Sequence, residues 1–366
     1  MKKIFFLFLS TAAFLGLSGT AVYQSAASSL ENPNQTANLS GERKPITDSS
    51  ADRDPPKDIP VSFSNEAVFE LFREGEYWGK YSRLEDAVSA ASGQPHSSVR
   101  RKGETRWVWD NYPPFDVFLV GSSYAGGDSY AEFDTFAGAA GFAREQDRAF
   151  VYYRKNNRLI WDNTTALPVR ANTSVPLTLQ MPELPRGCEV TSLAMLLSSQ
   201  SVRVDKMTLA ERVSKDETPY EVKNGKIYYG NPHKGFVGHM SDFQKNGYGV
   251  YHEPIYNLLL EYLPMEALDL TGCEYADLEY FLALHTPVWV IINSTYAPLD
   301  PDSFVTWHTA DGPVKITYRE HSVLLTGYDG DTVYFNDPLG GEGEAEKVNF
   351  ALAWEQMGRQ AITCAP

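Results

Sequence analysis

The most informative run of the chain is Gln180-Met-Pro-Glu-Leu-Pro-Arg-Gly-Cys188-Glu-Val-Thr-Ser-Leu-Ala-Met-Leu-Leu197. Apolar residues after Cys188 recur at helical spacing, and Pro185 and Gly187 punctuate the chain just before it. The pattern predicts a buried helix that begins at the cysteine. The positive end of a helix dipole favours a thiolate, the nucleophile of cysteine hydrolases. A buried structural cysteine is the alternative interpretation.

A predicted hairpin supplies a base for this thiol. The runs His321–Asp329 and Thr332–Asp337 have the pattern of two paired strands. If the hairpin closes around residues 329–331, His321 lies directly opposite Asp337, with Cβ atoms roughly 5 Å apart. Asp337 could then orient the imidazole while its other nitrogen takes the thiol proton, whereas a surface His–Asp pair is the alternative. Asn336 points to the opposite face and is the rival orienter, a role that a one-residue bulge would give it.

Gln180 is a candidate oxyanion donor, because it precedes Cys188 by eight residues. A side-chain amide and the backbone N–H of the cysteine together could bind the oxyanion of an acyl-transfer intermediate. A solvent-exposed loop glutamine is the alternative. Further along, Pro287–Asn293 is a continuous apolar run that predicts a buried strand, and residues 306–309 and 314–318 alternate like a hairpin.

These residues resemble a known family. Gln180, Arg186–Met195, His321-Ser-Val and Asn336-Asp-Pro338 are similar to the bacterial papain-like cysteine peptidases related to the double-glycine leader peptidases. The resemblance is closest to the secreted, stand-alone branch, and it extends to three further stretches: Gly230–Gly238, Gly249–Pro254 and Trp354–Ala361.

The resemblance implies an α+β papain-like fold, in which the helix bearing the cysteine packs on an antiparallel sheet. It makes Cys188 the nucleophile, His321 the base, Asp337 the orienter and Gln180 the oxyanion donor. Glu189 departs from the family pattern, which often has glycine there, and its carboxylate could raise the pKa of the thiol. The chain carries no ATP-binding motif, so the transporter-coupled role of the leader peptidases is not implied.

Residues 61–168 contain an internal repeat. Trp109-Asp110-Asn111 returns 52 residues later as Trp161-Asp162-Asn163, and the same offset relates Leu84, Ala87 and Ala91 to Phe136, Ala139 and Ala143. We therefore predict a small duplicated α+β accessory domain ahead of a peptidase domain at 170–366. The accessory domain could bind wall material, substrate or a partner, or it could be a spacer or a pro-region whose aromatic residues form only a core.

The N-terminal region predicts export. Residues 1–27 have the charged start, short apolar run and small residues of a signal peptide or N-terminal anchor, and residues 28–60 have the composition of a disordered linker. We expect a secreted or cell-surface protein whose contact with the membrane is limited to this segment if it stays uncleaved. A net charge of −15 argues against a nucleic-acid partner.

Histidines and cysteines elsewhere suggest no cofactor. His233, His239 and His252, with Asp242 and Glu253 near them in the chain, follow no zinc-binding spacing, so we predict no metal. The glycine-rich loop Gly230–Gly238 is better suited to lining a substrate cleft. Cys273 and Cys364 could form a disulfide or remain free.

The sequence thus predicts an exported cysteine peptidase that acts on a peptide or protein substrate, with the cell wall as one setting. An amidase or transpeptidase of wall peptides with the same chemistry is an alternative. A non-catalytic binding protein that keeps the fold is another.

Overall fold

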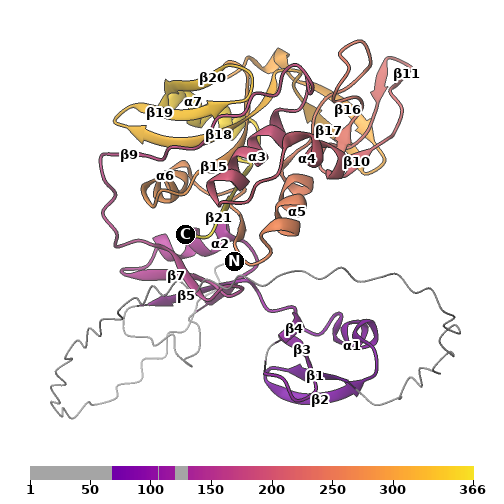
Figure 1. Ribbon diagram of the computed structural model, residues 1–366, viewed down its shortest axis with the longest axis vertical. Coiled ribbons are helices and arrows are strands. Elements are labelled where there is room, and N and C mark those ends of the chain that lie inside the picture. Colours follow the sequence, from indigo (N-terminus) through magenta and orange to yellow (C-terminus); the bar gives the residue numbers. More distant parts are fainter. Residues whose placement is uncertain (1–67, 106, 120–130) are drawn as a thin grey trace, which may run out of the picture. The chain divides into compact units, whose positions relative to one another are not determined.

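The computed structural model describes residues 68–105, 107–119 and 131–366 (Figure 1). The predicted signal segment, the predicted linker and residues 61–67 lie outside the described residues. Within the described ranges no helix is both long and apolar enough to cross a bilayer. The helices in these ranges are α1 Leu84–Ala91, α2 Phe136–Arg144, α3 Cys188–Ser199, α4 Lys206–Arg212, α5 His252–Tyr262, α6 Tyr275–Ala283, α7 Lys347–Gln356 and the 3-10 helix η1 Pro301–Ser303.

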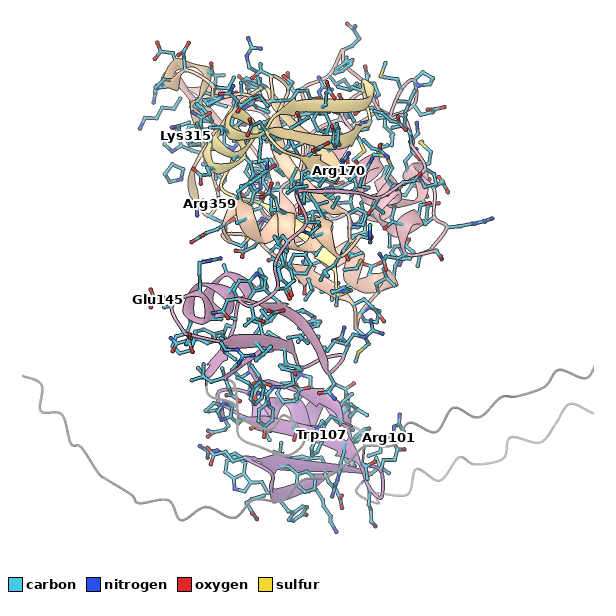
Figure 2. All side chains as sticks on the ribbon, turned by 90° about the vertical axis from the view of Figure 1, so that its left-hand side faces the viewer. Arg101, Trp107, Glu145, Arg170, Lys315 and Arg359 are labelled. Carbon is cyan, nitrogen blue, oxygen red and sulfur yellow. The ribbon has the colours of Figure 1, made fainter. Side chains whose placement is uncertain are left out.

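The first sheet is antiparallel and is covered by α1. Its strands are β1 Phe69–Arg73, β2 Glu76–Tyr81, β3 Ser97–Arg101 and β4 Trp107–Asp110, in the order β2-β1-β3-β4. Ala87 and Ala91 of α1 are fully buried against this sheet, because a small side chain lets the helix approach closely. Trp107 and Arg101, which Figure 2 labels, lie on β4 and β3, and the Trp107 side chain is exposed.

The second sheet has the same connectivity. Its strands are β5 Phe115–Leu119, β6 Ala131–Phe133, β7 Ala149–Tyr153 and β8 Arg158–Asp162, in the order β6-β5-β7-β8, with α2 packed on it. Asn111 and Asn163, which end the two Trp-Asp-Asn turns, form corresponding bonds. Oδ1 of Asn111 accepts from the Ser97 N–H and Oδ1 of Asn163 from the Ala149 N–H. The domain boundaries and the duplication itself remain predictions.

The second sheet shares a hydrophobic core with α6. The rings of Phe136 and Phe281 pack edge to face with centroids 5.5 Å apart, and the Tyr280 hydroxyl donates to Asp162. Between α2 and α6, the Arg144 guanidinium donates to both oxygens of Asp277 at 2.8 Å. Apolar burial and charged hydrogen bonds therefore join this sheet to the C-terminal part of the chain.

The largest sheet carries α3 on one face. Its order is β14-β21-β15-β18-β19-β20, and β9 pairs with β18. The strands are β9 Arg170–Asn172, β14 Ala267–Asp269, β15 Val288–Asn293, β18 Glu320–Asp329, β19 Thr332–Asp337, β20 Gly341–Glu346 and β21 Ala361–Cys364. Every residue of β15 is buried, as its apolar run predicts. The indole N–H of Trp289 donates to the Glu189 carbonyl and so fixes α3 on the sheet.

Two small sheets lie beside this one. The parallel pair is β10 Lys215–Asp216 with β13 Phe236–Val237, and the other sheet has the order β11-β12-β16-β17. Its strands are β11 Glu221–Lys223, β12 Lys226–Tyr228, β16 Val305–Thr309 and β17 Gly312–Ile316. The hairpin predicted at residues 306–318 corresponds to β16 and β17.

The register between β18 and β19 differs from the prediction. Asp329 pairs with Thr332 beside the turn, but Leu324 pairs with Asn336, because Thr326 bulges without a partner across the pair. The predicted direct opposition of His321 and Asp337 is therefore wrong.

The bulge determines which side chain of β19 faces His321. Continuing the observed register places Asp337 opposite Val323, two positions from His321 and on the same face. Without the bulge, Asn336 would occupy that face instead. The predicted effect of a one-residue bulge is thus reversed, since a bulge assigns this face to Asp337.

Candidate active site

Cys188 is the first residue of α3, and Gly187 is the residue before the helix. A Cβ on Gly187 would lie 2.6 Å from Cβ of Leu184, so the tight turn into the helix requires glycine. The Cys188 side chain is 6% exposed. The helix therefore begins at Cys188, as predicted, and the thiol is almost buried.

The side chains of His321, on β18, and Asp337, on β19, are in direct contact. Nε2 of His321 lies 2.8 Å from Oδ1 of Asp337. Because a carboxylate only accepts, Nε2 carries the proton of this bond and Nδ1 remains available to other partners. His321 is the second residue of β18 and pairs across the sheet with Ile292 of the fully buried strand β15.

Asp337 accepts hydrogen bonds from three directions. Besides His321, the Tyr296 hydroxyl donates to Oδ2 at 2.6 Å and the Leu339 N–H donates to Oδ1 at 2.7 Å. Burial alone would raise the pKa of Asp337, but the bond and charge of His321, together with these donors, lower it to about 2. The carboxylate is therefore ionised and held in one orientation.

Asn336 points elsewhere, as consecutive strand residues must. Its Nδ2 donates to the Val175 carbonyl at 3.0 Å. The rival orienter thus ties residues preceding Gln180 to β19 and makes no contact with His321 that would orient the ring.

Gln180 lies beside the turn that leads into α3. Its Nε2 donates to the Pro185 carbonyl at 2.8 Å and to the Leu184 carbonyl at 3.1 Å. Its backbone N–H donates to Pro338, one residue after Asp337. Its buried Oε1 has no hydrogen-bond partner in the described part of the chain. The side chain is buried, so the alternative of a solvent-exposed loop glutamine is wrong.

Cys188, His321 and Gln180 line one cavity of about 600 Å³. Its other walls include Tyr248, Glu320 and the loop residues 243–247. A second cavity of about 970 Å³ adjoins it, since Tyr220 and residues 244–246 line both. Of the loop predicted to line a cleft, Phe236 and Gly238 line this second cavity.

Residues 172–362, more than half of the chain, match the model of the Peptidase_C39 like family. The chain belongs to this family. YvpB of Bacillus subtilis (strain 168), an uncharacterized protein, is 42% identical over 185 residues, which are 50% of this chain and 71% of YvpB. We refer to residues 172–362 as the C39-like domain.

The C39-like domain is also similar to solved structures. A candidate C39-like peptidase from Bacillus anthracis is 45% identical with a TM-score of 0.51, covering 54% of this chain and 98% of that one. A double-glycine-motif protease from an AMS/PCAT transporter, crystallised with a leader peptide, is 17% identical with a TM-score of 0.30 over 55% of this chain and 99% of that one. The predicted family and α+β cysteine peptidase fold are confirmed.

Two carboxylates of the C39-like domain lie beside the thiol. Cys188 Sγ donates to Oε2 of Glu189 at 3.3 Å, and the Val250 N–H donates to Oε1 of Glu189 at 2.7 Å. One atom each of Cys188, Glu189 and Glu320 lies within 4.8 Å of the other two. Oε1 of Glu320 has no hydrogen-bond partner among the described residues.

These carboxylates change the expected electrostatics. Burial raises the pKa of the Cys188 thiol, and the negative charges of Glu189 and Glu320 raise it further. Burial also raises the pKa of Glu189 to about 7 and, with the charge of Glu189, raises that of Glu320. The effect of Glu189 therefore has the expected direction, and burial and Glu320 add to it: in the resting site these effects oppose the helix dipole and raise the thiol pKa.

Sequence reasoning identified Glu189 but missed Glu320 and Tyr296. Glu320 directly precedes His321, and that adjacency was the available signal. Tyr296 lies after β15 with a φ of 54°, in a turn fixed where Oδ1 of Asn293 accepts from the Thr295 N–H. No sequence pattern indicates that this turn reaches Asp337.

The three cysteines are free and buried. A different group of side chains has the composition of a metal site, since His233, His252 and Glu253 converge although their spacing predicted none. His239, the third histidine considered, is exposed and outside this group.

Proposed function

We propose that the C39-like domain is an active cysteine peptidase. One observation carries the proposal: the thiol of Cys188, the imidazole of His321 and the amide of Gln180 line one cavity, while Asp337 engages Nε2 of His321. That arrangement leaves Nδ1 of His321 for the thiol proton, as a nucleophile, base and orienter require.

In the proposed reaction, Nδ1 of His321 accepts the proton of Sγ and the thiolate attacks the carbonyl carbon of a peptide bond. The thiolate forms beside the new imidazolium, which offsets the high pKa of the resting thiol. The C–N bond then breaks and His321 protonates the leaving amine. Water attacks the thioester, gives its proton to His321, and Sγ leaves as the thiol.

The oxyanion is proposed to bind the backbone N–H of Cys188 and Nε2 of Gln180. The first N–H groups of a helix have no acceptor within the helix, so the Cys188 N–H is available. Gln180 must exchange one of its two present bonds for this role, and the longer one, to Leu184, is the weaker. Gln180→Ala should lower kcat about 10²-fold with little change in KM.

The substrate class proposed is a peptide chain, because the family is one of peptidases and the two adjoining cavities offer an extended path. Wall peptides are included, and the same chemistry could end in amidase or transpeptidase products. We further propose that residues 1–27 direct export, residues 28–60 form a tether and the two similar sheets form a duplicated accessory region. Fractionation of cells that express the full chain tests the proposed location.

A peptide-library digest tests the activity. The full chain is compared with Cys188→Ala, and Cys273→Ala serves as the matched control because Cys273 is also buried and free. We expect cleavage by the wild type and the control but not by Cys188→Ala. Equal product profiles from all three proteins, or no product from any, would favour the non-catalytic binding protein.

A further inference from the structure

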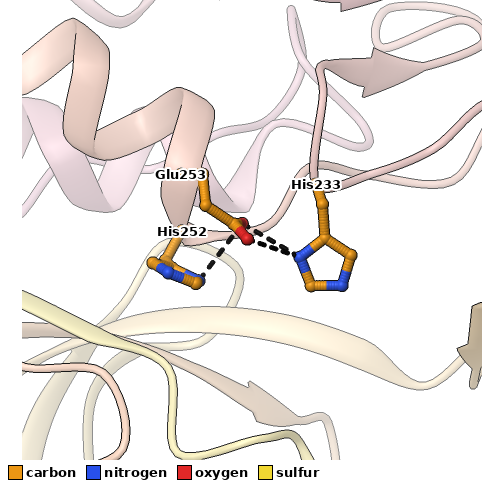
Figure 3. A group of neighbouring side chains, drawn as sticks. All are labelled: His233, His252 and Glu253. Atoms are coloured by element: carbon orange, nitrogen blue, oxygen red, sulfur yellow. Dashed lines mark hydrogen bonds and ion pairs between the residues drawn. The ribbon is translucent and has the colours of Figure 1, made fainter. Parts of the chain in front are cut away.

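We propose that His233, His252 and Glu253 form a binding site for a divalent transition metal, of which Zn²⁺ is the best match. Figure 3 shows the three side chains converging: His233 comes from the loop between β12 and β13, and the other two open α5. Nδ1 of His233 lies 2.8 Å and 3.0 Å from the two carboxylate oxygens of Glu253. Nδ1 of His252 lies 3.2 Å from Oε2.

The distances suit coordination. Zn²⁺ ligands at about 2.05 Å with tetrahedral angles lie about 3.4 Å apart. The ligand atoms of His233, His252 and Glu253 all lie within 4.8 Å of one another, and the observed contacts need to open by only a few tenths of an ångström. Two imidazoles and one carboxylate are a ligand set that zinc uses where a fourth position stays open.

The backbone holds this geometry without a metal. The His233 N–H donates to Oδ1 of Asn231, and the Asn231 N–H donates to Oδ2 of Asp216. The Tyr251 N–H donates to the Pro232 carbonyl, which joins the loop to the start of α5. One bond therefore ties the loop to the helix start, and two others fix the loop that carries His233.

Two polar groups flank the imidazole of His252. Nε2 lies 3.6 Å from Oδ2 of Asp269, longer than a hydrogen bond, on the side where metal-binding histidines usually have a carboxylate. Nε2 of Gln360 donates to the Met357 carbonyl, which turns Oε1 of Gln360 to 3.1 Å from Nδ1 of His252. This neutral oxygen is a candidate fourth ligand. Glu253 and Asp269 together offset the charge of a divalent cation.

The site is accessible from a cavity of about 360 Å³. His233, His252 and Gln360 line it, together with Thr271 and Lys315. The Lys315 ammonium lies over the ring of Phe304, 4.6 Å from the centroid, where that ring partly offsets its charge. A metal can thus enter, and water can complete its coordination.

The proposed site is also joined to the thiol. Val250, two residues before His252, donates its N–H to Glu189, and Glu189 accepts from Cys188. A metal that fixes the start of α5 would therefore also fix the carboxylate beside the nucleophile. The metal proposal does not depend on catalysis and is tested without measuring it.

Equilibrium dialysis against Zn²⁺ and thermal melting test the site. The full chain carries Cys188→Ala in all samples, because Cys188, Glu189 and Glu320 are a second group with ligand atoms close together. We expect one Zn²⁺ per chain and, at hundredfold excess over Kd, a rise in Tm of roughly 5–10 °C.

Variants in this background identify the ligands. His233→Ala and Glu253→Gln should each weaken binding by at least tenfold, whereas His239→Ala, an exposed histidine outside the cluster, should leave it unchanged. Circular dichroism of the metal-free variants checks that they fold, and visible absorption of bound Co²⁺ reports tetrahedral coordination. Binding below one-fifth of an equivalent at 100 µM Zn²⁺, or equal affinity in His233→Ala, would overturn the proposal.

Discussion

The thiol of Cys188 donates a hydrogen bond to Oε2 of Glu189, its neighbour in the first turn of α3, across 3.3 Å. The resting site therefore holds the proton on sulfur and places a carboxylate where a thiolate would form. At a helix start without this carboxylate, the dipole would lower the thiol pKa, whereas here the carboxylate of Glu189 raises it.

Glu189→Gln should make Cys188 more reactive. The amide carries no charge, and its nitrogen can donate to the thiolate while its oxygen still accepts from Val250. We expect the thiol pKa to fall and the rate of iodoacetamide alkylation near pH 7 to rise about tenfold, as one pKa unit implies. Glu217→Gln, at an exposed residue of the neighbouring cavity, is the control. An alkylation rate that falls or stays constant in Glu189→Gln would contradict this account.

Stability should decrease as the pH rises through the titration of Glu189. Its pKa is about 7 in the folded protein, against 4.5 for an unperturbed glutamate, so the folded state binds more protons between these values. The free energy of unfolding then falls from pH 5 to pH 8, by on the order of 3 kcal/mol if Glu189 titrates alone. Urea denaturation at several pH values measures this. Glu189→Gln should flatten the profile, and an unchanged slope would assign it to other groups.

Substitution of Asp337 should lower activity, whereas substitution of Asn336 should lower stability. Asp337→Ala removes the acceptor of Nε2 of His321, so kcat should fall 10²–10⁴-fold by the magnitudes that orienting and proton-transfer groups show. Asn336→Ala leaves the Val175 carbonyl without its donor and should cost about 1–2 kcal/mol of stability while kcat changes little. Peptide hydrolysis and urea denaturation of both variants decide the matter. Equal kcat values would refute the assignment of Asp337 as orienter.

Gly187→Ala should distort the turn that leads into α3 and positions Cys188. The new Cβ would meet Leu184 at 2.6 Å, and we expect a loss of about 1–3 kcal/mol in stability with reduced alkylation of Cys188. Gly141→Ala is the matched control, because Gly141 lies within α2 and an added Cβ meets no atom within 4 Å. That variant should gain about 0.5–1 kcal/mol from helix propensity. Thermal or urea unfolding of the two variants compares them directly.

Local patterns in the sequence were enough to predict the elements that carry the site. The apolar run after Cys188 predicted α3, and the run at Pro287–Asn293 predicted β15, because periodicity reports which faces are buried. The choice of Asp337 over Asn336 rested on a register that is wrong. A bulge at Thr326 nevertheless places Asp337 on the face of the sheet that carries His321. Bulges depend on the packing of the whole sheet, which strand patterns do not encode.

Local sequence patterns could not predict contacts between segments that are far apart in the chain. Glu320 faces Glu189, and Tyr296 reaches Asp337, only because β15 and β18 lie side by side beneath α3. The group formed by His233, His252 and Glu253 was dismissed on spacing for the same reason. A loop and a helix start supply its ligands, and their separation along the chain follows no motif.

Arg186 joins the segment 239–245 to the turn that precedes Cys188. Arg186 lies two residues before Cys188. Its guanidinium donates to the carbonyls of His239, Asp242 and Lys245, and its backbone N–H donates to the Met240 carbonyl. The segment 239–245 is therefore held by hydrogen bonds to a residue that lies only two positions before Cys188. We therefore expect a displacement of this segment to change the reactivity of the Cys188 thiol as well.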